Sequence, residues 1–126
     1  MIRVAVALFA TLLGGLPAKA EIATAQADGA VLRALDKVSG TITDQTLLQD
    51  TTMQVGNLSI TLSECRYPTD NPVGDAFARI VVRSDKQALP VFQGWMVASS
   101  PALSSLDHAR YDVWVLRCTI PEAETE

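Results

Sequence analysis

The sequence predicts a mostly β fold, a small β-sandwich or partly open barrel with one short helix and a single disulfide. Short runs of apolar residues alternate with polar residues at a period near two, as in strands that bury one face. Glycine, proline, asparagine and aspartate separate these runs at short intervals, which is typical of all-β domains. The chain has two cysteines, Cys65 and Cys118, which allow one intramolecular bridge. The order of the strands does not follow from these patterns.

The strands are expected at short intervals along the chain, at residues 31–36, 41–48, 53–55, 58–65, 76–82, 90–97 and 111–119. The clearest is the strand that begins at Leu58, where apolar residues alternate with serine and threonine up to Ser63. Cys65 has the opposite parity from Leu62, so a bulge or a switch of faces is expected near Glu64.

Two further segments have specific signatures. Residues 76–82 are apolar on both faces except at Arg79, which predicts a central strand rather than an edge strand. Residues 99–106 resemble a helix start, with Ser100 as the N-cap and Pro101 at the first helical position. This helix has room for one or two turns.

The N-terminal residues predict that the protein is exported. Residues 1–20 have the features of a signal peptide: Arg3, the apolar run 4–16 and the small-residue pattern Ala18-Lys19-Ala20, with cleavage after Ala20. A retained membrane anchor is the alternative, but the run is shorter than the roughly 20 residues that a spanning helix needs. We therefore expect a periplasmic protein with a flexible lead-in at 21–29, a β domain at 30–120 and an acidic tail at 121–126.

The cysteines and the charge limit the possible partners. Two cysteines suit an oxidising compartment, and a bridge from residue 65 to residue 118 would contribute about 4 kcal/mol in the chain-entropy model. The alternative is two separate buried thiols. The net charge is −4 and the basic residues are scattered, so nucleic acid and anionic membrane surfaces are not expected as partners.

The residues that bear chemistry do not form a known catalytic or metal-binding motif. His108 is the single histidine, so no zinc site is expected, and no cofactor is implied. Asp70, Asn71 and Asp75 share a loop, but their spacing does not match a calcium-binding EF-hand and favours a turn.

A small hydrolase is one alternative function, with Ser99 or Ser100 as nucleophile, His108 as base, and Asp107 or Asp112 as the orienting acid. No G-x-S-x-G motif supports it, and His108 is explained more simply as the end of the short helix. A glycan-binding or peptidoglycan-binding module that uses Trp95 or Trp114 is another alternative, although a domain of this size favours both tryptophans as core residues.

Long stretches of the sequence resemble the family known as domain of unknown function 2155, which consists of secreted proteins, mainly from alphaproteobacteria. The resemblance covers about residues 30 to 119. It rests on Ala34-Leu35-Asp36-Lys37, Cys65-Arg66-Tyr67-Pro68, Asn71-Pro72, Gly74-Asp75-Ala76-Phe77-Ala78, Phe92-x-Gly94-Trp95-Met96, Ala98-Ser99-Ser100-Pro101-Ala102-Leu103, Leu106-Asp107-His108, and Arg110-Tyr111-Asp112-Val113-Trp114-Val115-Leu116-x-Cys118. It implies a periplasmic location and that both cysteines belong to the family pattern. It supplies no catalytic residue, cofactor or partner.

The leading hypothesis is a non-enzymatic periplasmic domain that binds another protein or complex of the cell envelope. Loops held on a rigid sheet often carry binding residues, so residues 99–110 are the expected surface. The candidate binding residues are Trp95, Ser99, Ser100, Asp107, His108 and Arg110.

Overall fold

The computed structural model describes residues 14–16, 22–104, 106 and 108–120. These residues form strands and one short 3₁₀ helix, in the order β1 (Thr24–Gln26), β2 (Gly29–Asp36), β3 (Ile42–Leu48), β4 (Thr52–Val55), β5 (Leu58–Pro68), β6 (Phe77–Ser84), β7 (Phe92–Val97), η1 (Pro101–Leu103) and β8 (Tyr111–Thr119). The predicted signal peptide, its cleavage site and the acidic tail lie outside the described residues, apart from residues 14–16, which carry no regular structure.

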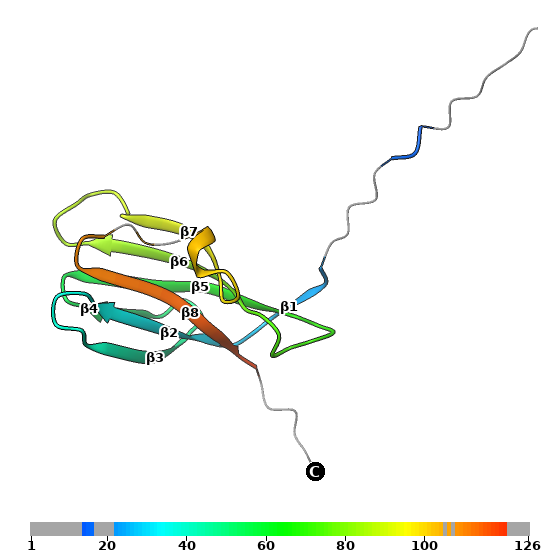
Figure 1. Ribbon diagram of the computed structural model, residues 1–126, viewed down its shortest axis with the longest axis horizontal. Coiled ribbons are helices and arrows are strands. Elements are labelled where there is room, and N and C mark those ends of the chain that lie inside the picture. The colour runs from blue at the N-terminus through cyan, green and yellow to red at the C-terminus, as the bar shows by residue number, and fades with distance from the viewer. Residues whose placement is uncertain (1–13, 17–21, 105, 107, 121–126) are drawn as a thin grey trace, which may run out of the picture.

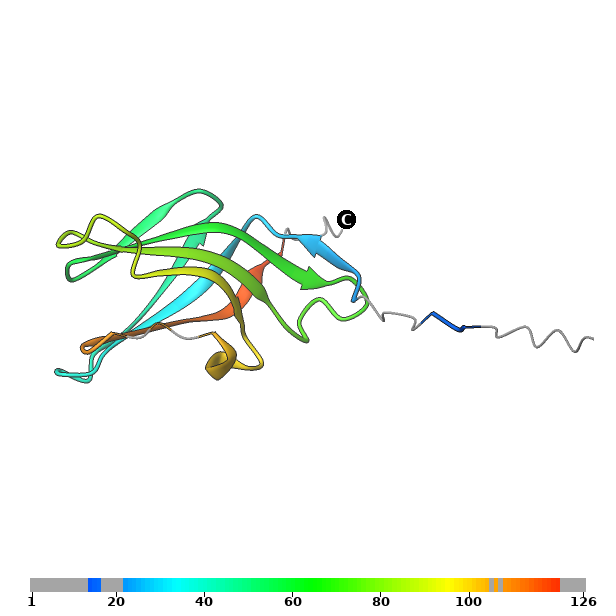
Figure 2. The same ribbon diagram turned by 90° about the horizontal axis from the view of Figure 1, so that it is seen from above.

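The strands form two antiparallel sheets that face each other (Figure 1). Sheet A has the order β1-β5-β6-β7, and β4 also pairs with β5; sheet B has the order β3-β2-β8. The view from above separates the two layers (Figure 2). Both sheets are open, so the predicted mostly β sandwich is confirmed. The chain crosses from sheet A to sheet B between β7 and β8, and η1 lies on this crossing.

The core fills the space between the sheets, and β5, β6 and β8 contribute alternate residues to it. β5 contributes Leu58, Ile60 and Leu62, and these side chains have no exposed surface. Other fully buried side chains come from β2, β6, β7 and β8, and they include Leu32, Ile80, Val82, Met96 and Val115. The hydroxyl-bearing residues between the β5 leucines and isoleucine face outward, as the alternation predicts.

The predicted irregularity near Glu64 is confirmed. The register of β5 against β6 shifts between Leu62 and Glu64, which is a β-bulge. Because of this extra residue, Cys65 points inward while Glu64 and Arg66 point outward. The central position of β6 is also confirmed, since β6 pairs with β5 on one side and with β7 on the other.

The Cys65–Cys118 disulfide is present, with 5.8 Å between the two Cα atoms. Cys65 belongs to β5 in sheet A and Cys118 to β8 in sheet B, so the bridge joins the two layers covalently. Both cysteines belong to the buried core.

Two expectations need correction. The compact part begins before Ala30, because β1 pairs with the end of β5 and Ala27 is buried. The sequence Thr24-Ala25-Gln26 has no large apolar residue, so it becomes a strand through hydrogen bonds to β5 and not through its own pattern. The predicted helix is a single 3₁₀ turn, and its N-cap Ser100 makes no side-chain capping bond.

Candidate functional site

The predicted binding residues that the structure describes lie on different elements of the fold. Trp95 lies on β7 and faces outward from sheet A. Ser99 and Ser100 lie just after β7, on the crossing between the sheets, whereas His108 and Arg110 precede β8. Asp107 lies outside the described residues. Closeness in the sequence therefore does not place these side chains in one site.

Ser99 is held by a carboxylate from another loop. Its hydroxyl donates to Asp75 Oδ2 at 2.7 Å, and its backbone N–H donates to Asp75 Oδ1 at 3.0 Å. Asp75 Oδ1 also accepts from the N–H of Ala76 at 2.8 Å. These bonds tie the loop before β6 to the segment after β7. Because both Ser99 donors serve this tie, the residue is best explained as structural.

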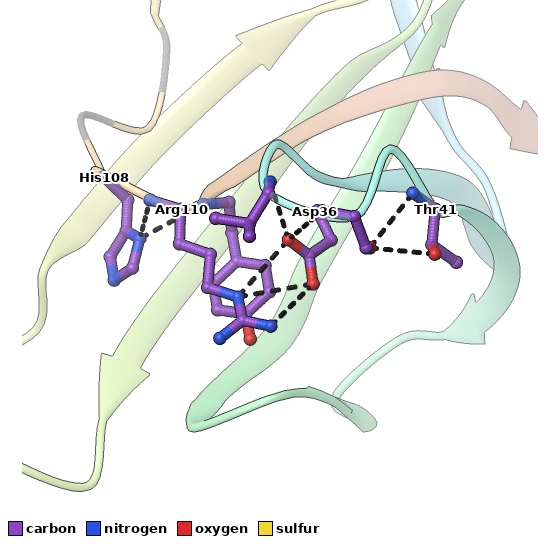
Figure 3. A network of polar contacts seen from close by, with 7 residues as sticks. Asp36, Thr41, His108 and Arg110 are labelled. Atoms are coloured by element: carbon purple, nitrogen blue, oxygen red, sulfur yellow. Dashed lines mark hydrogen bonds and ion pairs between the residues drawn. The ribbon is translucent and has the colours of Figure 1, made fainter.

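His108 stabilises the turn that leads into β8 (Figure 3). Its Nδ1 accepts hydrogen bonds from the backbone N–H of Arg110 at 3.0 Å and from that of Tyr111 at 3.2 Å. Its carbonyl oxygen accepts from Lys37 Nζ at 2.6 Å. The expectation that His108 ends the short helix is wrong, because that helix ends at Leu103 and the imidazole serves the next turn instead.

Arg110 binds Asp36 at the end of β2, in the same network (Figure 3). Arg110 Nη2 donates to Asp36 Oδ2 at 3.0 Å, and the Asp36 carboxylate also accepts from the backbone N–H groups of Val38 and Ser39. The Arg110 guanidinium, helped by these N–H groups, lowers the pKa of Asp36 to about 2. The network fixes the β2–β3 turn against the start of β8.

The expectation that both tryptophans fill the core is wrong. Met96 takes the inward position on β7, so Trp95 faces outward and is 39% exposed. On β8 the inward positions belong to Val113 and Val115, so Trp114 lies half-buried on the outer side of sheet B. Trp114 shares a pocket with Pro101, Ala102 and Leu106, which belong to the crossing segment.

Trp95 borders a shallow groove of about 440 Å³ on the outer face of sheet A. We call it the Trp95 groove, and its walls are Ile22, Thr24, Arg66, Phe77 and Trp95. Arg66 is fixed there, because its Nε donates to Thr24 Oγ1 at 2.8 Å and its Nη2 donates to the Thr24 carbonyl at 3.2 Å. The groove thus combines exposed apolar side chains with an arginine held in place.

Arginines dominate the charge beside this groove. The outward positions of β5, β6 and β7 hold Arg66, Arg79 and Arg83 but one carboxylate, Glu64. Glu64 is opposite Arg79 in the register, yet its Oε1 lies 3.7 Å from Arg66 Nη1. Within the described part of the chain, no carboxylate lies within 4.0 Å of Arg79 or Arg83.

The sequence prediction included Trp95 but missed the other walls of its groove. The sequence pattern could have indicated the wall residue Phe77 and the neighbouring Arg79. They lie at outward positions of one strand, and Trp95 lies at an outward position of the next strand. Ile22 and Thr24 gave no such signal, because Thr24 lies on the unexpected strand β1 and Ile22 lies just before it.

The described residues also lack two common kinds of feature. No three of their His, Cys, Asp and Glu side chains gather into a group that could hold a metal ion. None of the helices in this part of the chain is both long and apolar enough to cross a membrane.

Fold and site together define a disulfide-linked, two-sheet β domain with an aromatic groove on one outer face. Residues 30–118 match the family described as "Uncharacterized protein conserved in bacteria (DUF2155)", and the chain belongs to this family. The predicted resemblance is therefore confirmed.

An uncharacterised protein of Rickettsia prowazekii (strain Madrid E) is 30% identical to this chain over 88 residues. The aligned part is 68% of this chain and 57% of the Rickettsia protein, so the chain spans less than two thirds of that relative. No solved structure matches the chain.

Proposed function

We propose that this chain is a non-enzymatic domain that binds another protein of the cell envelope through the Trp95 groove. The observation that carries the proposal is an exposed tryptophan beside Phe77 and Ile22 on the outer face of a sheet whose core is filled by other residues. Tryptophan and arginine are the residues that most often dominate binding energy at protein interfaces. Grouped exposed apolar side chains also mark interaction sites more often than single ones.

The groove chemistry favours an apolar side chain of a protein over a sugar ring. A sugar site needs polar groups that are free to bond hydroxyls around an aromatic platform. In this groove the Thr24 hydroxyl and the Arg66 guanidinium bond each other. The other walls are Ile22, Phe77 and Trp95, which offer apolar contact apart from the indole N–H.

The geometry around His108 gives no support to the hydrolase alternative. In a Ser-His-Asp triad the histidine Nδ1–H donates to a carboxylate, while Nε2 faces the serine. Here Nδ1 accepts two backbone N–H groups, so it cannot carry the proton that would bind such a carboxylate. The Ser99 hydroxyl donates to Asp75 and not to an imidazole.

A periplasmic location is part of the proposal. The signal-peptide features of residues 1–20 support it, and so does the Cys65–Cys118 bridge, because disulfides persist in oxidising compartments. On this proposal the mature protein starts at Glu21. The mass of the N-terminal peptide of the protein recovered from periplasm checks the site.

The test is quantitative capture with a matched pair of variants. The tagged protein is crosslinked in envelope extracts of its own bacterium, and captured proteins are compared for wild type, Trp95→Ala and Gln93→Ala. Gln93 is the control because it lies on the same strand and the same outer face but does not border the groove. We expect the partner to be lost with Trp95→Ala and kept with Gln93→Ala.

Thermal melts establish that both variants fold. Identical captured proteins for a folded Trp95→Ala variant and the wild type would contradict the proposal. Retention on peptidoglycan sacculi that depends on Trp95, without any captured protein, would favour the glycan alternative instead.

A further inference from the structure

We infer that the Trp95 groove and the neighbouring arginines recognise an acidic, extended segment of the partner, which inserts an apolar side chain into the groove and places carboxylates against Arg79 and Arg83. This inference rests on the proposed function and adds the chemistry of the partner.

The outward side chains of β6 lie in a row that starts at the groove. Its outward residues are Phe77, Arg79, Val81 and Arg83, whereas Ala78, Ile80 and Val82 are buried. Alternate residues of a strand are about 7 Å apart. The wall of the groove at Phe77 and the two arginines therefore lie on one line along the strand, which an extended chain of the same repeat can follow.

Two arginines in this row differ from most other arginines of the chain in their contacts with carboxylates. Arg33, Arg66 and Arg110 each have a carboxylate of this chain within 4.0 Å. Among the described residues, Arg79 and Arg83 have none, and the one carboxylate on their face contacts Arg66. Arg117, which also has no such contact, lies on the other sheet, where its charge acts on Asp44. Beside the groove, two positive charges are thus left to a partner.

The charge of this face is opposite in sign to the net charge of the chain. The whole chain carries a net charge of −4, so the face with Arg66, Arg79 and Arg83 has the opposite sign from the molecule as a whole. An acidic segment is attracted to this face and repelled by the rest of the surface. Such complementarity increases the association rate and fixes the register of binding more than it adds affinity.

A pair of synthetic peptides tests the inference. The first has a central leucine, with glutamate at the second and sixth positions on either side and serine elsewhere, so that it fits the strip in either direction. The second has glutamine in place of every glutamate. Binding is followed by the fluorescence of Trp95 in a Trp114→Phe background, where Trp95 is the one tryptophan of the chain.

We expect the glutamate peptide to bind about fivefold more tightly than the glutamine peptide, as two partly exposed ion pairs would give. The double variant Arg79→Gln/Arg83→Gln should bind the two peptides with about equal affinity. Arg117→Gln should keep the preference for the glutamate peptide unchanged. Higher salt should weaken binding of the glutamate peptide more than that of the glutamine peptide.

Equal binding of the two peptides, or no binding of the glutamate peptide, would overturn the inference. So would an anionic glycan that binds through Arg79 and Arg83 when the peptides do not. The proposed function fails separately: it fails if Trp95→Ala leaves partner capture unchanged, whatever the peptides do. If Trp95→Ala abolishes capture and the two peptides bind equally, the inference of an acidic partner segment is wrong, but the proposal that the Trp95 groove binds a partner is kept.

Discussion

The two outer faces of the sandwich each carry a carboxylate, an arginine and a tryptophan in the same order across three strands. On sheet B the row is Asp44, Arg33 and Trp114, and on sheet A it is Glu64, Arg79 and Trp95. On sheet B, Arg33 binds both oxygens of Asp44 at 2.7 and 2.8 Å, and Trp114 is half-buried. On sheet A, Glu64 contacts Arg66 instead, and Trp95 is exposed.

The difference shows that the same residue types in the same order make different contacts on the two faces. Beside the bulge between Leu62 and Glu64, Glu64 lies opposite Arg79 in the register but contacts Arg66. Beside β8, residues of the crossing segment line a pocket together with Trp114. The arginine of the sheet B row therefore has a carboxylate partner within the chain, whereas the arginine of the sheet A row has none within 4.0 Å among the described residues.

The largest expected effect tests whether the disulfide stabilises both sheets to the same extent. Replacing both cysteines, Cys65→Ala/Cys118→Ala, should lower the free energy of unfolding by about 2–4 kcal/mol. Because the bridge joins the sheets, the loss should be equal whether unfolding is followed by Trp95 or by Trp114. Urea denaturation of the two single-tryptophan backgrounds, Trp114→Phe and Trp95→Phe, measures each face. If the midpoint moves for one tryptophan and not for the other, the faces do not share one support.

The next prediction compares the two tryptophans directly. Trp114→Ala should cost about 1–2 kcal/mol of stability, because a large, half-buried apolar side chain is removed. Trp95→Ala should cost less than Trp114→Ala, under about 1 kcal/mol, because 39% of the Trp95 surface is already exposed. Urea denaturation of both variants gives the difference. Equal losses would mean that Trp95 is a structural residue, and the comparison of the faces would break.

The smallest effect concerns acid and the charges that the chain pairs internally. The pKa of Asp36 is lowered to about 2 by Arg110 and by the Val38 and Ser39 N–H groups, so its stabilising contribution is complete above the unfolded pKa of about 3.9. This contribution is lost as the pH falls through 2. The melting temperature of the wild type should therefore drop more between pH 5 and pH 2 than that of Asp36→Asn. Arg110→Gln should show the same reduced drop, and an unchanged drop in both variants would contradict the assignment.

Much of the fold could be predicted because its causes are local. The alternation from Leu58 to Ser63 defines an inward and an outward face, and the opposite parity of Cys65 requires the bulge. The disulfide was expected over two separate thiols, because two cysteines allow one intramolecular bridge. β1 could not be predicted, because its short polar sequence pairs with the far end of β5, and that partner is known only once the sheet has formed.

The candidate site was harder to predict, because it depends on which segments meet. Ser99 and Arg110 are close in the sequence, yet Asp75 fixes the first and Asp36 fixes the second at different places. Trp95 was named for its residue type. Its outward direction follows from Met96 taking the core position, which a parity argument could have supplied.

The Cys65–Cys118 bridge also determines how the chain transmits force. The covalent loop that it closes contains all of β6 and β7, including Phe77, Arg79, Arg83 and Trp95. Tension applied between the two ends of the chain would pass from residue 65 to residue 118 through the sulfur atoms and bypass the strands between them. Ile22 and Thr24 lie outside the loop, on the side of the chain that bears the load. A pull on the N-terminal side would thus move Ile22 and Thr24 away from the Trp95 groove. The strands β6 and β7, which carry the aromatic and arginine side chains, would stay within the covalent loop.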